Sequence, residues 1–129
     1  SGNLYVWGKG SYGYGNDIGG NNLIAQKVLE NVESLVHWDR ANTRIIVKLK
    51  SSDSFLGFGF NTDGSLGIGT NANSNIFTPV YVPSNVSEFA FIGFGAGGHL
   101  VMIAKNKLYA CGTASNGSIK YTTPTLQKQ

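Results

Sequence analysis

The sequence predicts an all-β fold of four-stranded antiparallel sheets, arranged as the blades of an incomplete β-propeller. The chain is rich in glycine and poor in charge, with 18 glycines and only 13% charged residues among its 129 positions. Such a composition, together with many aromatic residues, is typical of short strands joined by tight turns. A unit of about 50 residues also returns along the chain, and a β-rich tandem repeat of this length indicates propeller blades.

The repeat is clearest in three apolar segments that end at a glycine. Each has two apolar residues, a spacer, a large or sulfur-containing side chain and then the glycine; the final pairs are Trp7-Gly8, Phe58-Gly59 and Cys111-Gly112. These pairs are spaced by 51 and 53 residues. The intervening stretches also agree, because NVESLV at 31–36 overlays NVSEFA at 85–90. The agreement divides the chain into partial units at 1–17, 18–71 and 72–121, with a tail at 122–129.

Within each unit the pattern predicts short strands and turns. The runs LYVW and FLGF are apolar and are closed by a glycine, as expected of buried strands. Asp63-Gly64 and Asn116-Gly117 predict hairpin turns, because these residue types tolerate a positive φ. The polar residues at 50–53 and 105–107 are expected to turn the chain into the next strand.

The stretch FGFNTDGSLGIGT, residues 58–70, resembles the repeat of the RCC1 family, the seven-bladed propellers of the regulator of chromosome condensation. The family pattern runs roughly WG-x-N-x-x-G-Q-L-G-x-G, followed by a Pro-x-x-Val stretch and an apolar Gly-x-x-His segment. The positions that fill it are Phe58, Gly59, Asn61, Gly64, Leu66, Gly67, Gly69, Pro79, Val82 and His99. The chain departs from the pattern at Ser65, where Gln is usual, and at Ala96, where a glycine is usual. The resemblance covers nearly the whole chain.

The number of units raises the question of closure. A closed propeller has typically four to eight blades, whereas this chain holds about two and a half units. Three explanations are open: the sequence is part of a longer polypeptide, several copies assemble, or a partner chain supplies the missing blades. We favour the first of them.

Two glycine patterns imitate a nucleotide-binding loop. The G-x-G-x-x-G matches are Gly8, Gly10 and Gly13, and Gly93, Gly95 and Gly98. A dinucleotide site also needs a following helix and an acidic residue about 20 positions further on. No Asp or Glu follows Glu88, and no Gly-Lys-Ser/Thr completes a Walker loop. We therefore expect tight β-turns at these glycines, and no cofactor.

Side chains that could carry other chemistry are sparse. Cys111 is the only cysteine, which excludes an intrachain disulfide and a multi-cysteine zinc site. His37 and His99 have no cysteine or carboxylate at ligand spacing, so no metal site is expected. We expect Cys111 to be a core thiol and His99 to make a structural hydrogen bond within its blade. Since no paired carboxylates suggest acid–base catalysis either, the chain is not expected to be an enzyme.

One segment deviates from the repeat and is the candidate partner-binding site. HWDRANTR at 37–44 puts Trp38, Arg40 and Arg44 where the next unit has small residues. Trp and Arg dominate the energetics of protein interfaces, so these three residues are predicted to contact a partner. The alternative is ordinary sequence drift, with the tryptophan packed and both arginines in solvent.

The function predicted from these observations is a non-catalytic protein–protein interaction module. The resemblance also implies an alternative: a guanine nucleotide exchange factor for a Ran-type small GTPase, or a chromatin-associated regulator. The expected partner is accordingly a protein, either a small GTPase or the remaining blades of a propeller. A net charge of +3 without a basic run supports nucleic-acid binding only weakly. The lone thiol, with no signal peptide or membrane-spanning run, predicts an intracellular protein, cytoplasmic or nuclear.

Overall fold

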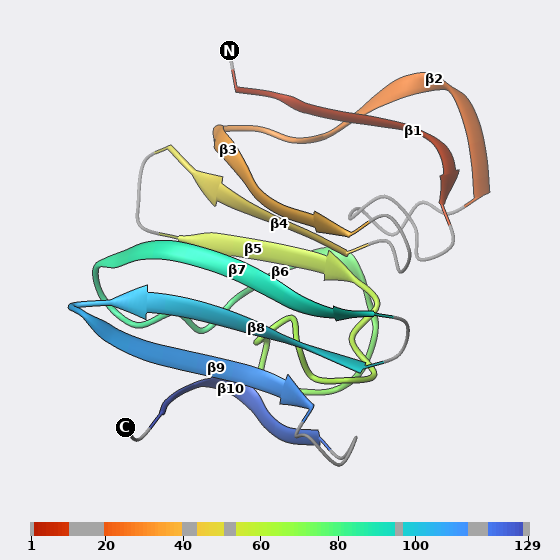
Figure 1. Cartoon of the computed structure of the whole chain (residues 1–129). Coiled ribbons are helices and arrows are strands. Elements are labelled where there is room, and N and C mark those ends of the chain that lie inside the picture. Colours follow the sequence, from red (N-terminus) through yellow and green to blue (C-terminus); the bar gives the residue numbers. More distant parts are fainter. Residues whose placement is uncertain are drawn as a thin grey trace.

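The computed structural model describes residues 2–10, 20–39, 44–50, 54–94, 97–113 and 119–127. Within these ranges the chain forms ten strands in three antiparallel sheets and has no helix (Figure 1). The same part of the chain therefore offers no helix that could cross a membrane. The all-β expectation and the four-stranded antiparallel sheets are confirmed.

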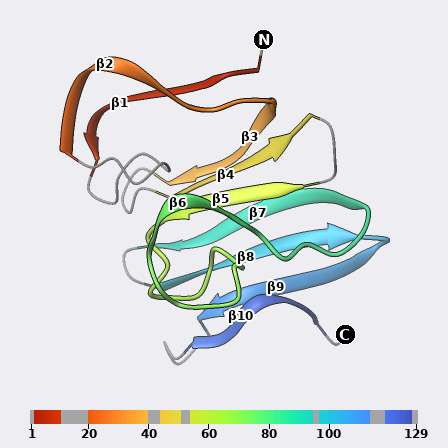
Figure 2. The same ribbon diagram turned by 180° about the vertical axis from the view of Figure 1, so that it is seen from behind.

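The three sheets follow one another along the chain, and we name them by position. The amino-terminal sheet pairs β1 (Leu4–Gly10) with β2 (Gly20–Leu29). The central sheet has the spatial order β3 (Val32–Asp39), β4 (Arg44–Leu49), β5 (Phe55–Gly59) and β6 (Ser74–Pro79). The carboxyl-terminal sheet has the order β7 (Val86–Phe94), β8 (Gly97–Ala104), β9 (Lys107–Thr113) and β10 (Ile119–Leu126). Figures 1 and 2 show the central sheet lying between the other two.

The backbone repeats with the sequence. The glycines that end the three apolar segments all have a positive φ, of 102° at Gly8, 113° at Gly59 and 112° at Gly112. Asn31 and Asn85, which open the overlaid stretches NVESLV and NVSEFA, have φ angles of 61° and 62°. Since a positive φ is uncommon and favours glycine and asparagine, its return at equivalent positions confirms the repeat.

The predicted turns are confirmed in part. Lys105 and Asn106, with φ angles of 50° and 60°, form the two-residue turn between β8 and β9. Gly64 closes a turn by donating its backbone N–H to the carbonyl of Asn61, at 2.9 Å. However, this turn is not a two-residue hairpin, because β5 and β6 are joined by the whole segment 60–73. The turn predicted at Asn116-Gly117 lies outside the described residues.

The main core lies between the central and carboxyl-terminal sheets. Its buried members come from β4, β5, β8, β9 and the connections around β6: Ile46, Phe55, Leu66, Val80, Leu100, Met102 and Cys111. The ring centroids of Phe55 and Phe89 lie 4.7 Å apart across the two sheets. Burying each such side chain contributes roughly 1.5–3 kcal/mol, so this contact holds the two sheets together. The segment 60–73, which supplies Leu66, is part of that contact and is called here the inserted loop.

The sheets and the predicted units have different boundaries. The central sheet ends with β6 at Pro79 and the next begins at Val86, whereas the sequence was divided at 71/72. The predicted units therefore remain a division of the sequence, and one unit contributes strands to two sheets.

Candidate functional site

The residues predicted to contact a partner lie around the connection between β3 and β4. In the strand pairing, Trp38 lies opposite Ile45 and Asp39 lies opposite Arg44, the first residue of β4. Arg40 is outside the described residues. The connection thus leaves the end of the central sheet with Trp38 and Arg44 on its two flanks.

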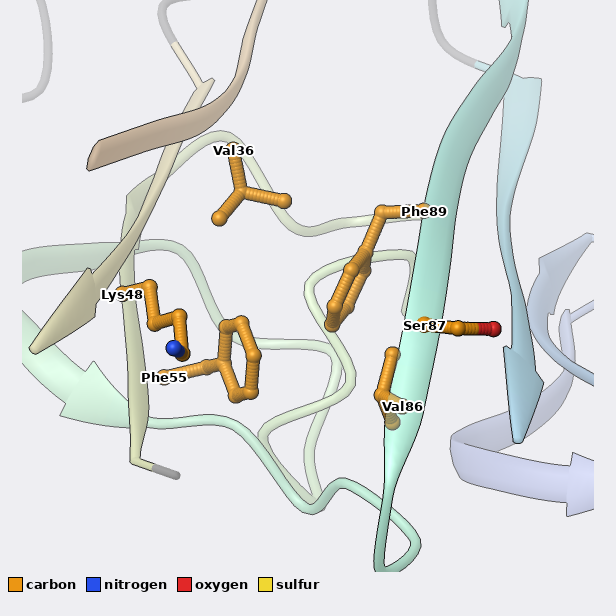
Figure 3. Close-up of a pocket in the computed structure, with 6 residues that line it drawn as sticks. All are labelled: Val36, Lys48, Phe55, Val86, Ser87 and Phe89. Carbon is orange, nitrogen blue, oxygen red and sulfur yellow. The ribbon is translucent and has the colours of Figure 1, made fainter. Parts of the chain in front are cut away.

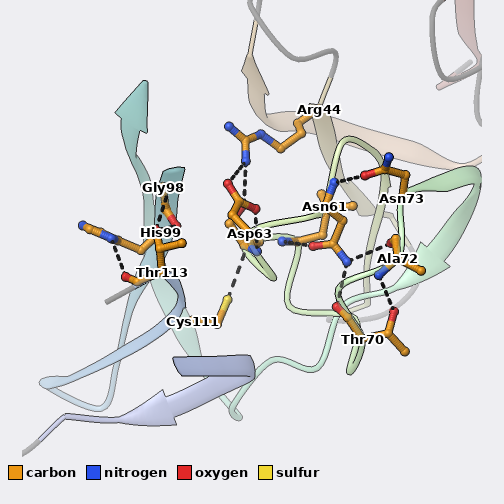
Figure 4. A network of polar contacts seen from close by, with 12 residues as sticks. Arg44, Asn61, Asp63, Thr70, Ala72, Asn73, Gly98, His99, Cys111 and Thr113 are labelled. Atoms are coloured by element: carbon orange, nitrogen blue, oxygen red, sulfur yellow. Dashed lines mark hydrogen bonds and ion pairs between the residues drawn. The ribbon is translucent and has the colours of Figure 1, made fainter. Parts of the chain in front are cut away.

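Arg44 is buried, with only 1% of its surface exposed. Its Nη1 donates hydrogen bonds of 2.6 Å to Asp63 Oδ2 and of 2.6 Å to Ser65 Oγ (Figure 4). The guanidinium carbon also lies 5.3 Å from the centroid of the Phe60 ring, within the range of a cation–π contact. Arg44 therefore fixes the start of β4 to the inserted loop.

This burial bears on both explanations of the deviating segment. It argues against direct contact between Arg44 and a partner, and the partner-binding role of Trp38, Arg40 and Arg44 stays a prediction. The drift explanation placed both arginines in solvent, and for Arg44 that placement is wrong. Because a buried guanidinium needs a charged and hydrogen-bonded partner, the Asp63 carboxylate determines where this arginine lies.

The side chain of Asn61 bonds to both arms of the inserted loop. Asn61 Nδ2 donates to the carbonyls of Thr70, at 2.8 Å, and Ala72, at 3.0 Å. Asn61 Oδ1 accepts from the backbone N–H of Leu66 at 2.9 Å. The backbone N–H of Asn61 donates to Asn73 Oδ1 at 2.6 Å. The family-pattern asparagine thus satisfies backbone groups on both arms of the loop, and its side chain is fully engaged.

The loop glycines face protein atoms. Gly67 has a φ of +70°, and a Cβ there would lie 3.2 Å from Pro124 Cδ and 3.3 Å from Cys111 Sγ. Its carbonyl accepts the backbone N–H of Tyr81 at 2.9 Å. This stretch therefore brings two sheets into close contact, as expected of a blade connection.

The second glycine pattern forms a strand pair. Gly93 lies opposite Gly98 and Phe94 opposite Gly97 in the β7–β8 ladder, so no helix follows these glycines. The expectation of a β-turn is consistent with this pairing, although residues 95–96 lie outside the described ranges. The geometry that a dinucleotide site requires, a glycine loop leading into a helix, is replaced by antiparallel strands.

The two remaining chemical candidates are structural. His99 Nδ1 lies 3.3 Å from the carbonyl of Thr113 on the neighbouring strand, which confirms the expected hydrogen bond within the sheet. Cys111 is 2% exposed, and its Sγ donates to the carbonyl of Ser65 at 3.7 Å. In the part of the chain that the structure describes, no three His, Cys, Asp or Glu side chains gather as a metal site would require.

Cys111 gives a direct test of this packing. Burial raises the pKa of its thiol to about 12, and the nearby Asp63 carboxylate adds to the rise, while a hydrogen bond from the Leu100 backbone opposes it. At pH 8 only about one thiol in ten thousand would then be ionised, and the thiolate is the reactive form. We expect negligible labelling by a disulfide reagent at pH 8 in the folded protein and complete labelling in urea. Labelling of the folded protein at the rate of an exposed thiol would contradict the buried position.

A cavity of about 310 Å³ lies between the central and carboxyl-terminal sheets (Figure 3). The residues that line it are Val36, Lys48, Phe55, Val86, Ser87 and Phe89. Lys48 Nζ is already 2.5 Å from Glu33 Oε2. Four of these six residues are apolar, and Lys48 and Ser87 are the polar ones.

Comparison with known proteins agrees with this arrangement. A family model, that of the regulator of chromosome condensation (RCC1) repeat, matches residues 53–104. This segment of the chain is similar to an RCC1 repeat. The repeat includes β5, β6, β7 and β8, so it joins half of the central sheet to half of the carboxyl-terminal sheet. A search of curated proteins gave no match.

Sequence reasoning missed the pair formed by Arg44 and Asp63, which lie 19 residues apart. Two signals could have found it. Arg44 directly precedes the apolar run IIV, where a charged side chain lies at the entry to a buried strand. Asp63 and Ser65 flank a glycine inside the RCC1 pattern, and polar residues there need partners if the loop is buried.

Proposed function

We propose that this chain is a non-catalytic protein–protein interaction module built on RCC1-type sheets. The observation that carries the proposal is that the polar residues in the RCC1 pattern bond to the chain itself. Its polar side chain, Asn61, and the neighbouring Asp63 and Ser65 all bind groups of the chain. Residues bonded in this way stabilise a rigid support, and binding residues are commonly presented on connections at the ends of such supports.

The connection between β3 and β4 is the proposed contact surface. It follows Trp38 on β3, contains Arg40 and returns at Arg44. The ion pair of Arg44 with Asp63 fixes the start of β4, where the connection returns to the sheet. Trp38 and Arg40 are then the residues proposed to touch the partner, with Arg44 as a positioning residue.

The test compares the amounts of partner protein captured by the immobilised chain and by its variants. The double variant Trp38→Ala and Arg40→Ala is expected to lose partners that the unchanged chain retains, with affinity for an isolated partner falling at least about thirtyfold, as for interface hot spots. Tyr81→Ala is the matched control, because Tyr81 is 61% exposed and lies outside this connection. Equal capture by the double variant and the unchanged chain would contradict the proposed surface.

An exchange assay separates the proposal from the alternative suggested by the resemblance. Adding the chain to a Ran-type GTPase loaded with fluorescent GDP is expected to leave the rate of nucleotide release unchanged. An accelerated release would favour a guanine nucleotide exchange factor over a general interaction module.

A further inference from the structure

The cavity between the central and carboxyl-terminal sheets is not part of the proposed contact surface. Its volume of about 310 Å³ lies at the lower end of the range, about 300–1,000 Å³, in which proteins bind small molecules. Strands β3, β4 and β5 form one side of it and β7 forms the other. The space is therefore built by two sheets of this chain, and its size suits a ligand as small as a single substituted ring.

The walls of the cavity are apolar. Phe55 and Phe89 meet from the two sheets, with ring centroids 4.7 Å apart and ring planes inclined at 45°. Val36 and these two rings surround the same space (Figure 3). Ser87 belongs to the lining, but its hydroxyl points away and donates to the Ile103 carbonyl at 3.2 Å. Aromatic and aliphatic walls of this kind suit a flat apolar group.

Lys48 is the one cation among the lining residues that the structure describes. Its side chain is 31% exposed and runs along the wall beside Phe55 (Figure 3). The ammonium pairs with Glu33, a residue outside the described lining whose side chain is 47% exposed. Because an ammonium carries several N–H donors, it can accept a second carboxylate or exchange one carboxylate for another. Exposed ion pairs are weak, so Glu33 is a competitor that a ligand can displace.

We propose that this cavity binds a small aromatic carboxylate. The ring packs against Val36, Phe55 and Phe89, and the carboxylate accepts a hydrogen bond from Lys48 Nζ at the rim. The charge of the ligand decides the class: an anion gains the ammonium, a neutral ring gains the walls alone, and a cation is repelled.

This site is separate from the proposed partner contact. It uses neither Trp38 nor Arg40, and a small molecule in the cavity would leave the β3–β4 connection open to a protein. The inference therefore goes beyond the proposed function and does not depend on it.

Titration of the full chain with phenylacetate, followed by protein nuclear magnetic resonance, tests the proposal. Saturable binding is expected in the millimolar range, in keeping with the few atoms that such a ligand offers. Nuclear Overhauser contacts are expected from the phenyl protons to the methyl groups of Val36 and Val86. The matched probes 2-phenylethanol and 2-phenylethylammonium keep the ring and replace the carboxylate by a neutral or cationic group. Each should bind at least about tenfold more weakly, because each lacks the charge-assisted hydrogen bond.

Two substitutions on the surface of the central sheet should act in opposite directions. Lys48→Met is expected to weaken phenylacetate binding about tenfold and to leave 2-phenylethanol binding unchanged, since only the charge is lost. Glu33→Gln is expected to strengthen phenylacetate binding about twofold to fivefold, because the competing carboxylate is gone. Lys107→Met is the matched control: it removes an exposed lysine outside the described lining and should bind phenylacetate like the unchanged chain.

Unaltered far-ultraviolet circular dichroism would show that each variant keeps its fold. The proposal would be overturned by the absence of saturable phenylacetate binding to the unchanged chain. Equal affinity for the three probes, or equal weakening by Lys48→Met and Lys107→Met, would also overturn it, because the anion would then not be recognised by Lys48. Contacts of the phenyl protons that spare both valines would place the ligand elsewhere and would count against it as well.

Discussion

Replacing Asp63 by alanine is expected to lower the free energy of unfolding by about 3–5 kcal/mol, the range found when one partner of a buried ion pair is removed. Asp63 and Arg44 are 2.6 Å apart, and their side chains are 0% and 1% exposed. The substitution removes the charge that compensates the buried guanidinium and also removes acceptors for Ser65. Urea denaturation followed by circular dichroism measures the change.

The control for this prediction is Glu33→Ala. This substitution also removes an ion pair within the central sheet, the pair of Glu33 with Lys48, but the Glu33 side chain is 47% exposed. Exposed pairs contribute between zero and about 1 kcal/mol, so this variant should unfold close to the unchanged protein. If the two variants lost equal free energy of unfolding, burial of the Arg44–Asp63 pair would not be the cause of its stabilising effect. A second variant, Arg44→Met with Asp63→Leu, should recover most of the loss, because apolar residues can replace a buried pair.

The second large effect is expected at Gly112, where alanine should destabilise the fold by about 3 kcal/mol. The φ of +112° strains any residue with a Cβ. That Cβ would also lie 2.3 Å from the carbonyl oxygen of Gly98 and 2.8 Å from His99 Cα, both backbone atoms of β8. The sheet would have to open at this pair, and overpacking of this kind adds to the backbone strain. Thermal and urea unfolding measure the loss.

Gly8→Ala separates the two contributions. Gly8 holds the same repeat position with a φ of +102°, yet a Cβ there would meet no described atom within 4 Å. This variant should therefore carry the φ strain alone, of order 1–2 kcal/mol. If Gly8→Ala were as damaging as Gly112→Ala, the clash with β8 would not be the cause.

The parts of the fold that repeat in the sequence were the parts that could be predicted. The residue pairs that end at Gly8, Gly59 and Gly112 predict a positive φ at the glycine. This conformation is local, because each glycine alone permits it. The apolar runs before them likewise specify strands through alternation and closure. Sheet type and strand positions followed from such local signals.

The candidate site was less predictable because it depends on distant residues. The apolar run after Arg44 suggests a buried charge, but it does not reveal that Asp63 and Ser65 are the partners. As one of two arginines in HWDRANTR, Arg44 resembled a surface contact. Asp63-Gly64 looked like a hairpin turn because the dipeptide signal is local, whereas the loop containing it is shaped by Asn61 and by the next sheet. Long-range packing overrides the short-range signal at both places.

The inserted loop also bears on how the molecule unfolds. Leu66 belongs to the connection of one sheet but is buried in the core shared with the next, beside Leu100 and Cys111. Detaching either sheet would expose part of the other's core. Unlike a repeat array whose units melt one by one, these two sheets should lose their structure in a single cooperative transition. Hydrogen exchange of amides in β5 and β9 should then give a common free energy of opening.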